Sequence, residues 1–350
     1  MSAYLNTRVS LYSGRLWHAE DFDVLLRASD ADMANTLAER GLLQLAAGFS
    51  SSEKPVAGAA DPLSLEQRII AQTLDETRVL IRPLNGAARN FLIYWTARFE
   101  VSNVKTLLRG KMTGERSATL LARLTPMGSF GRLDHQELAL VEDVSELLRR
   151  LEAGPYTSIV RQARRAFEQS HDPFHLDAAL DRAYYEGLAH RAQTLENCAG
   201  PGFRGLMGNL IDRINLVWLL RYRFNYNLPP AQVYFLLVGS HYSLTGARLR
   251  ELAALGSPEA VLAELPLEWR ARLAAAPDIP GVFSMMDHIA AEHAVKVLRT
   301  DAPAITRAFA YLILRERDLR AVRAVLRGRH LGLSAADIRL ALQRTPQEVM

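Results

Sequence analysis

The chain has 350 residues, of which 49% are hydrophobic and 23% charged, and its formal net charge is +4. This length allows a sizeable core and two or three domains. The single cysteine, Cys198, excludes an internal disulfide framework and indicates a reducing compartment. Apolar runs fall short of the ~20 residues of a membrane helix, and no apolar signal segment follows Arg8 and Arg15, so we expect a soluble protein.

In chain order, the first half is predicted to be helices joined by loops. An N-terminal helical region ends near residues 41–49, and a small, polar surface loop follows at residues 50–62. A helix then starts at Pro62 and ends before Pro83. Its apolar face consists of Leu65, Ile69, Ile70, Leu74 and Ile81.

Long helices recur in the rest of the chain. One is predicted to start at Asn85 and to end with Gly110 as its C-terminal glycine, and Gly328 holds the same place in a later helix. Further helices are predicted at residues 138–151 and 160–167. Since no period-two pattern is needed anywhere, the sequence predicts an all-α fold.

The segment from Phe91 to Lys111 occurs three times, and its copies at residues 203–223 and 309–329 are spaced roughly 110 residues apart. Each copy opens with Phe, carries an acid nine places on and closes with a leucine-arginine pair. The shared positions are Phe91, Glu100 and Arg109; Phe203, Asp212 and Arg221; Phe309, Asp318 and Arg327. A repeat this long predicts three related helical domains rather than layers of a solenoid, and we place them at residues 1–125, 126–235 and 236–350.

The repeat extends on both sides of this segment. Upstream, an acid recurs after an apolar residue. The aligned pairs are Leu65-Glu66, Leu180-Asp181 and Met286-Asp287. Downstream, a Gly-Ser pair precedes Leu133 in copy one and Leu244 in copy two, whereas copy three ends before it reaches this loop.

Asn103 and Asn215 occupy the same place in copies one and two, where copy three has Ala321. An amide in the middle of an apolar helix face needs a partner when it is buried. We expect that partner to be an adjacent helix end.

Two basic residues close each copy. The pairs are Arg109 and Lys111, Arg221 and Arg223, and Arg327 and Arg329. Cations at a helix C-terminus stabilise the helix by about 0.3–1 kcal/mol, which accounts for them structurally. Alternatively, the three basic ends form a ring that meets acidic groups on a partner.

Two motifs resemble ligand sites. The glycines Gly200, Gly202 and Gly205 match the dinucleotide spacing, but the preceding residues read as helix and the required acid is absent about 20 residues later. His288 and His293 flank Glu292 with a spacing that leaves the two imidazoles off a common helix face. We therefore predict no catalytic, cofactor-binding or metal-binding residues and no cofactor.

The stretch from Arg213 to Arg250 contains no acid but five arginines and several aromatic residues. Such a mixture can bind single-stranded nucleic acid. Rings at helical spacing are also typical of a core or a protein interface, which we favour here.

The chain resembles the C subunit of the prokaryotic V-type (archaeal/vacuolar-type) ATPase, which is the counterpart of the eukaryotic d subunit. The most specific matches are residues 3–6 with Arg8-Val9 at the N-terminus and Asn103 to Lys111 in copy one. Near the C-terminus they are Arg315-Glu316-Arg317, Val322-Arg323 and Leu331-Gly332-Leu333. The resemblance implies a funnel of three helical domains around a pseudo-threefold axis. It also implies a non-catalytic central-stalk subunit, peripheral on the cytoplasmic face of the membrane, between the shaft subunits and the proteolipid ring.

Overall fold

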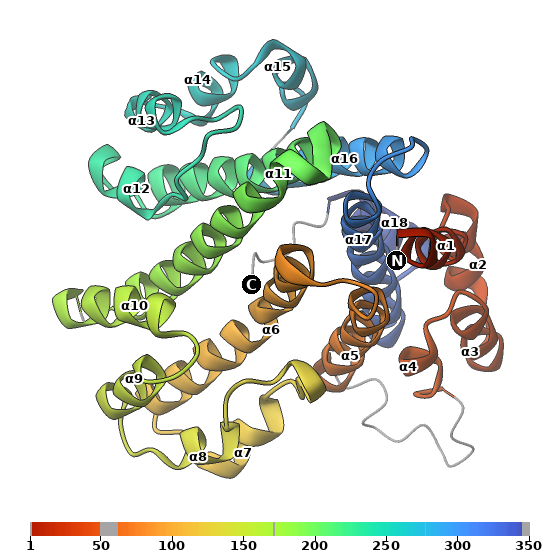
Figure 1. The fold of residues 1–350 in the computed structure, drawn as a ribbon, viewed down its shortest axis with the longest axis horizontal. Coiled ribbons are helices and arrows are strands. Elements are labelled where there is room, and N and C mark those ends of the chain that lie inside the picture. Colours follow the sequence, from red (N-terminus) through yellow and green to blue (C-terminus); the bar gives the residue numbers. More distant parts are fainter. Residues whose placement is uncertain (1, 50–61, 171, 277, 345–350) are drawn as a thin grey trace. The chain divides into compact units, whose positions relative to one another are not determined.

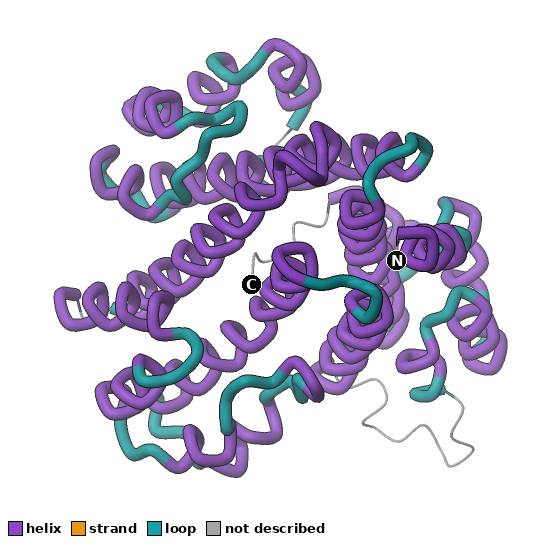
Figure 2. The backbone as a smooth tube through the Cα atoms, in the orientation of Figure 1, coloured by secondary structure: helices purple, strands orange, loops and turns teal. Residues whose placement is uncertain are grey.

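The computed structural model describes residues 2–49, 62–170, 172–276 and 278–344. These residues form helices joined by loops, with no strand among them (Figure 2). The all-α prediction is confirmed. Within the same residues, no helix has both the length and the apolar character to cross a membrane. The loop predicted at residues 50–62 lies outside this part of the chain, except for Pro62.

The chain divides into two compact units. Of the described residues, unit 1 comprises those in 2–93, 195–203 and 291–344, and unit 2 comprises those in 94–194 and 204–290. The three predicted domains remain a prediction.

Unit 1 contains the N-terminal helices and the last long helix. Its elements are α1 (Ser2–Ser13), α2 (Ala19–Arg27), α3 (Asp30–Glu39), α4 (Leu43–Ala46), α5 (Pro62–Ile81), the start of α6 (Gly86–Met112), the end of α16 (Ile279–Leu298), α17 (Ala304–His330) and α18 (Ala335–Arg344). Helix α17 contacts α1, α2, α5 and α18 (Figure 1). Its C-terminal half joins a buried cluster with α2–α4 through Leu25, Leu37, Val322 and Val325.

Unit 2 contains most of α6, most of α11 and the helices that follow each of them. Its other elements are α7 (Ser117–Arg123), the 3-10 turn η1 (Gly128–Phe130), α8 (His135–Leu140), α9 (Val144–Glu152), α10 (Thr157–Ser170), α11 (Pro173–Leu220), the π-helical turn η2 (Arg221–Asn225), α12 (Pro230–Leu236), α13 (Gly246–Ala254), α14 (Pro258–Ala263), α15 (Leu267–Leu273) and the start of α16.

Helix α11 is two helices joined at a kink. Gly200 has φ 79° and ψ 179°, and Pro201 follows it. Only glycine adopts this conformation readily, and proline is favoured in the first turn of the helix that follows. The Gly200 motif is therefore the start of the second repeated helix, and the helix before it leaves no strand for a dinucleotide site.

Several predicted helix boundaries are wrong. The helix predicted at residues 138–151 is two helices, α8 and α9, because the Asp143 carboxylate accepts a hydrogen bond from the backbone N–H of Glu146 and starts a new helix. Gly110 does not end α6, which continues to Met112 before a left-handed residue at Gly114, and Gly328 likewise does not end α17, which continues to His330 before the left-handed Gly332.

Candidate functional site at the three signature helices

We call α6, the part of α11 after Gly200 and α17 the three signature helices, because they carry copies one, two and three of the repeat. Their opening phenylalanines meet in unit 1. The ring centroid of Phe91 lies 5.1 Å from those of Phe203 and Phe309, which lie 5.6 Å from each other. All three side chains are 0% exposed. Equivalent residues of three repeats therefore share one buried aromatic contact.

The acids of copies one and two accept hydrogen bonds from the backbone at the end of the loop downstream. Glu100 Oε1 accepts hydrogen bonds from the backbone N–H groups of Arg132 and Leu133 at 2.8 and 3.0 Å. Asp212 accepts from the N–H groups of Ser243 and Leu244 at 3.0 and 3.1 Å. The residue after each leucine is the N-cap of a short helix, α8 or α13. Each acid thus anchors the helices that follow.

In copy three, the acid binds backbone in the N-terminal region of the chain instead of a loop downstream. Asp318 accepts a 3.0 Å hydrogen bond from the backbone N–H of Trp17, and His18 is the N-cap of α2. The contact joins residues 301 positions apart. We call α8–α9, α13–α15 and α2–α4 the three lobes, one for each signature helix. The sequence did not indicate the third pairing, since Trp17 carries no recognisable motif.

The two asparagines bind backbone just beyond a helix end. Asn103 Nδ2 donates to Thr125 O at 2.8 Å, and the N–H of Thr125 donates back to Oδ1 at 2.9 Å. Asn215 makes the same pair of bonds with Val238, at 2.9 and 2.8 Å. These backbone groups follow α7 and α12. Ala321 cannot make this contact, which distinguishes copy three.

The second basic residue of each copy binds a lobe. Lys111 Nζ donates to the carbonyl oxygen of Ala139 at 2.6 Å. Arg223 Nε donates to the carbonyl oxygen of Ala253 at 2.7 Å. Arg329 donates to the carbonyl oxygens of Leu25 and Leu26 at 3.0 and 3.1 Å. All these carbonyls belong to the last turn of a lobe's first helix, where carbonyls lack helical partners. Contact of these three side chains with another subunit stays a prediction.

The first basic residue of each closing pair differs in its contacts between copy one and the other two copies. Arg109 is 60% exposed and pairs with Asp177. Among the described residues, Arg221 and Arg327 make no side-chain hydrogen bond or ion pair, and Arg327 is exposed. These two arginines remain candidates for contact with a partner.

Successive copies are joined by ion pairs that use the acids aligned upstream of each signature helix. The pairs, each inside one unit, are Lys105–Asp181, Arg213–Asp287 and Arg323–Glu66. Copy one therefore binds copy two, copy two binds copy three, and copy three binds copy one. Lys105 and Arg323 hold the same place in the repeat, and Arg213 lies one turn earlier. The order of contacts closes into a cycle.

Unit 1 buries an additional charge network that sequence reasoning missed. Arg315 is 2% exposed and donates through Nη2 and Nε to Glu76 at 2.9 and 3.1 Å. Tyr311 donates its hydroxyl hydrogen to the same carboxylate. Burial and the Glu76 carboxylate raise the pKa of Tyr311, so its hydroxyl stays protonated. The network ties α5 to α17.

Burial also affects two of the repeated acids. It raises the pKa of Asp318 to about 7 and that of Asp212 to about 6, against the hydrogen bonds that lower them. Their charged forms are therefore costly inside the fold.

The aromatic stretch after Arg213 is partly buried in the structure. Trp218 and Tyr222 are buried, although Tyr226 and Phe235 are exposed. Among the described residues, no group of three or more His, Cys, Asp or Glu side chains could hold a metal ion.

These contacts define an all-helical repeat protein in which each signature helix anchors a lobe of short helices. By comparison with family models, residues 5–340 match the ATP synthase (C/AC39) subunit family, and the chain belongs to this family.

Similar proteins carry the name of the C subunit of the A-type ATP synthase. The chain is 24% identical over 291 residues to the one from Methanocaldococcus jannaschii, covering 81% of this chain and 72% of that protein. It is 25% identical over 352 residues to the one from Haloquadratum walsbyi, covering 96% of both proteins. For the one from Archaeoglobus fulgidus, identity is 22% over 341 residues, covering 96% of this chain and 94% of that protein.

Proposed function

We propose that the chain is a non-catalytic central-stalk subunit of a rotary A-type or V-type ATPase. It acts as a socket between the central shaft and the proteolipid ring of the membrane. Through it, torque passes between ATP hydrolysis or synthesis and the transport of protons or sodium ions. Membership in a family of ATP synthase subunits supports a place in a rotary ATPase. The socket role and the passage of torque are inferred from the repeat.

The observation that carries this proposal is the cyclic order of the three ion pairs. Three similar parts joined in a cycle suit a subunit that surrounds a rotation axis. The shared contact of Phe91, Phe203 and Phe309 fits the same arrangement. Close-packed helices are also stiff, as an element that transmits torque must be.

The proposed location is the cytoplasmic face of the membrane, where the chain is held peripherally through the ring. Exposed arginines give salt-sensitive contacts with such a partner. Arg327, which is exposed, and Arg221, which is half-buried, are the best candidates, because reversing their charge breaks no side-chain hydrogen bond or ion pair among the described residues.

The first test concerns the complex. A tagged chain purified from membranes of its own organism should bring down the other subunits of a rotary ATPase. Recovery of the chain without them, together with a salt-dependent gel shift on single-stranded DNA or RNA, would favour the nucleic-acid alternative instead.

The second test concerns the contact surface. The double variant Arg221→Glu with Arg327→Glu should capture less of the purified proteolipid ring than the unmodified chain. Arg82→Glu with Arg165→Glu is the matched control, since both arginines are exposed and lie outside the signature helices. Equal ring capture by both double variants, with unchanged circular dichroism, would remove these residues from the interface.

A further inference from the structure

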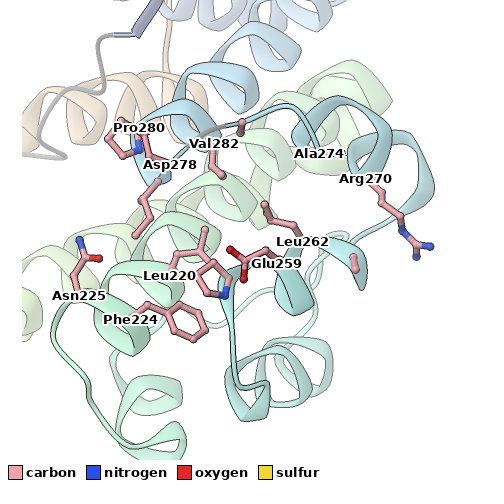
Figure 3. A pocket seen from close by; sticks show the side chains of 14 residues that line it. Leu220, Phe224, Asn225, Glu259, Leu262, Arg270, Ala274, Asp278, Pro280 and Val282 are labelled. Atoms are coloured by element: carbon pink, nitrogen blue, oxygen red, sulfur yellow. The ribbon is translucent and has the colours of Figure 1, made fainter.

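Unit 2 contains a cavity of about 570 Å³ beside the C-terminal end of the second signature helix (Figure 3). Its volume lies within the range of about 300–1,000 Å³ that is typical of ligand pockets. The walls come from the end of α11, the π-helical turn η2, α14, the end of α15 and the start of α16. Its main apolar residues are Leu220, Phe224, Leu262, Pro280 and Val282.

The signature helices of copies one and three end alike. The N–H of Glu115 bonds to Gly110 O at 2.8 Å, and the N–H of Leu333 bonds to Gly328 O at 3.0 Å. Each bond spans five residues around a left-handed glycine. Neither end contains a π-helical turn.

Copy two contains one residue more at this point. The corresponding bond joins the N–H of Leu228 to Tyr222 O at 2.9 Å and spans six residues. The left-handed position is Asn227, with φ 55°. A π-helical turn absorbs such an insertion and is often found at functional sites. Two residues of this turn, Phe224 and Asn225, line the cavity.

Carboxylates give the cavity its charge. Glu259 and Asp278 are exposed residues that line it, and the Asp278 carboxylate accepts a hydrogen bond from the N–H of Gly281 at 2.7 Å. Figure 3 shows the Glu259 carboxylate among the side chains of the cavity walls. Among the described residues, no cation forms an ion pair with Glu259. Hydrogen bonds from its own backbone N–H and the Ser257 hydroxyl lower its pKa, so it is ionised at neutral pH. Arg270 also lines the cavity, but its guanidinium extends away in Figure 3 and donates to Leu265 O at 3.3 Å.

We propose that this cavity docks a segment of a partner protein in which a large apolar side chain stands next to a lysine or arginine. The apolar walls would remove the large side chain from water. The Glu259 carboxylate would form a charge-assisted hydrogen bond with the cation, and an acidic segment would be repelled. This docking goes beyond the rotor role and does not depend on it.

The test uses the full chain with methyl-labelled Leu and Val, titrated by NMR. The probe is acetyl-Phe-Lys-amide, with acetyl-Phe-Gln-amide and acetyl-Phe-Glu-amide as its neutral and acidic counterparts. The lysine probe should give saturable shifts at Leu262 and Val282, with a Kd about two- to fivefold below that of the glutamine probe. Glu259→Gln should remove this difference. Glu268→Gln, an exposed acid outside the cavity, should retain it.

A second variant tests the location. Ala263→Trp places a large ring at the cavity wall and should abolish the shifts at Val282 while distant methyl signals stay in place. Three outcomes would overturn the proposal: no saturable shift with the lysine probe, equal affinity for all three peptides, or full binding by Ala263→Trp. Tighter binding of 4-phenylbutylamine than of the lysine probe would also overturn it, because it would assign the cavity to a small amine.

Discussion

Replacement of Asp318 by asparagine should remove a pH dependence from the stability of unit 1. The folded carboxyl has its pKa raised by burial to about 7, against 3.8 for the ordinary group. Between these values the folded chain binds a proton that the unfolded chain has lost, so this group's contribution to stability falls as pH rises. From pH 5 to pH 8, the loss amounts to about 2 to 3 kcal/mol.

Asparagine keeps an oxygen that can accept the hydrogen bond from Trp17, and it carries no charge to bury. It also gives up the attraction to Arg315, whose Nη1 lies 4.0 Å from the carboxylate. Because the ionised carboxyl is the costly form, we expect Asp318→Asn to exceed the unmodified chain in stability at pH 8, by about 2 to 3 kcal/mol more than at pH 5.

The assay is urea unfolding followed by circular dichroism at pH 5, 6.5 and 8, with the free energy of unfolding obtained by linear extrapolation. Glu268→Gln is the control, because this exposed acid should leave the pH dependence unchanged. The reasoning is refuted if the difference in stability between Asp318→Asn and the unmodified chain is the same at all three pH values.

Three further predictions concern the signature helices. Phe203→Ala should lower the free energy of unfolding by about 3–5 kcal/mol, because it opens a cavity between two other buried rings. Asn215→Ala should lower it by about 2–4 kcal/mol, because both backbone groups of Val238 lose their partner. Gly110→Ala should lower it by about 1–3 kcal/mol, although alanine favours helix, because the added Cβ would lie 2.0 Å from Leu120 Cδ2. Each change is measured by urea unfolding at pH 7.

Each of these variants has a control, which is a similar substitution to alanine at an exposed or open position. Leu267→Ala, Asn90→Ala and Gly239→Ala alter exposed or open positions and should each stay within about 0.5 kcal/mol of the unmodified chain. A variant of Phe203, Asn215 or Gly110 no more destabilised than its control would contradict the contact assigned to it.

The long helices could be predicted because their signals are local. Apolar residues at helical spacing, and the threefold recurrence of Phe, acid and leucine-arginine, needed no knowledge of contacts. The expectation that Asn103 and Asn215 need a helix end as partner followed from the cost of burying an amide. The partners themselves, Thr125 and Val238, carry no sequence signal, because only their backbone groups are used.

Other features depend on contacts that a sequence does not display. Trp17 completes copy three through its backbone N–H, across 301 residues, so no side-chain motif marks it. Gly110 was assigned to the end of its helix, but its function is to let Leu120 approach the helix closely. The additional residue of copy two appears only as a change of hydrogen-bond register between Tyr222 and Leu228.

The contacts of the basic residues that close each copy also could not be predicted from the sequence. Helix-dipole reasoning treated both members of each pair alike. In the structure, Lys111 reaches a lobe carbonyl, whereas Arg327 remains exposed. The two positions are two residues apart and so point to opposite sides of the helix, but only the packing of the lobes decides which side meets a carbonyl.

The central claim is that three copies of one helix meet through equivalent residues. The most direct measurement is the set of nuclear Overhauser effects among Phe rings in a protein that is deuterated except at Phe, with signals assigned by single Phe→Leu variants. The account predicts cross-peaks linking Phe91, Phe203 and Phe309, whose ring centroids lie 5.1–5.6 Å apart. Assigned rings that show cross-peaks to other residues but none to one another would contradict it.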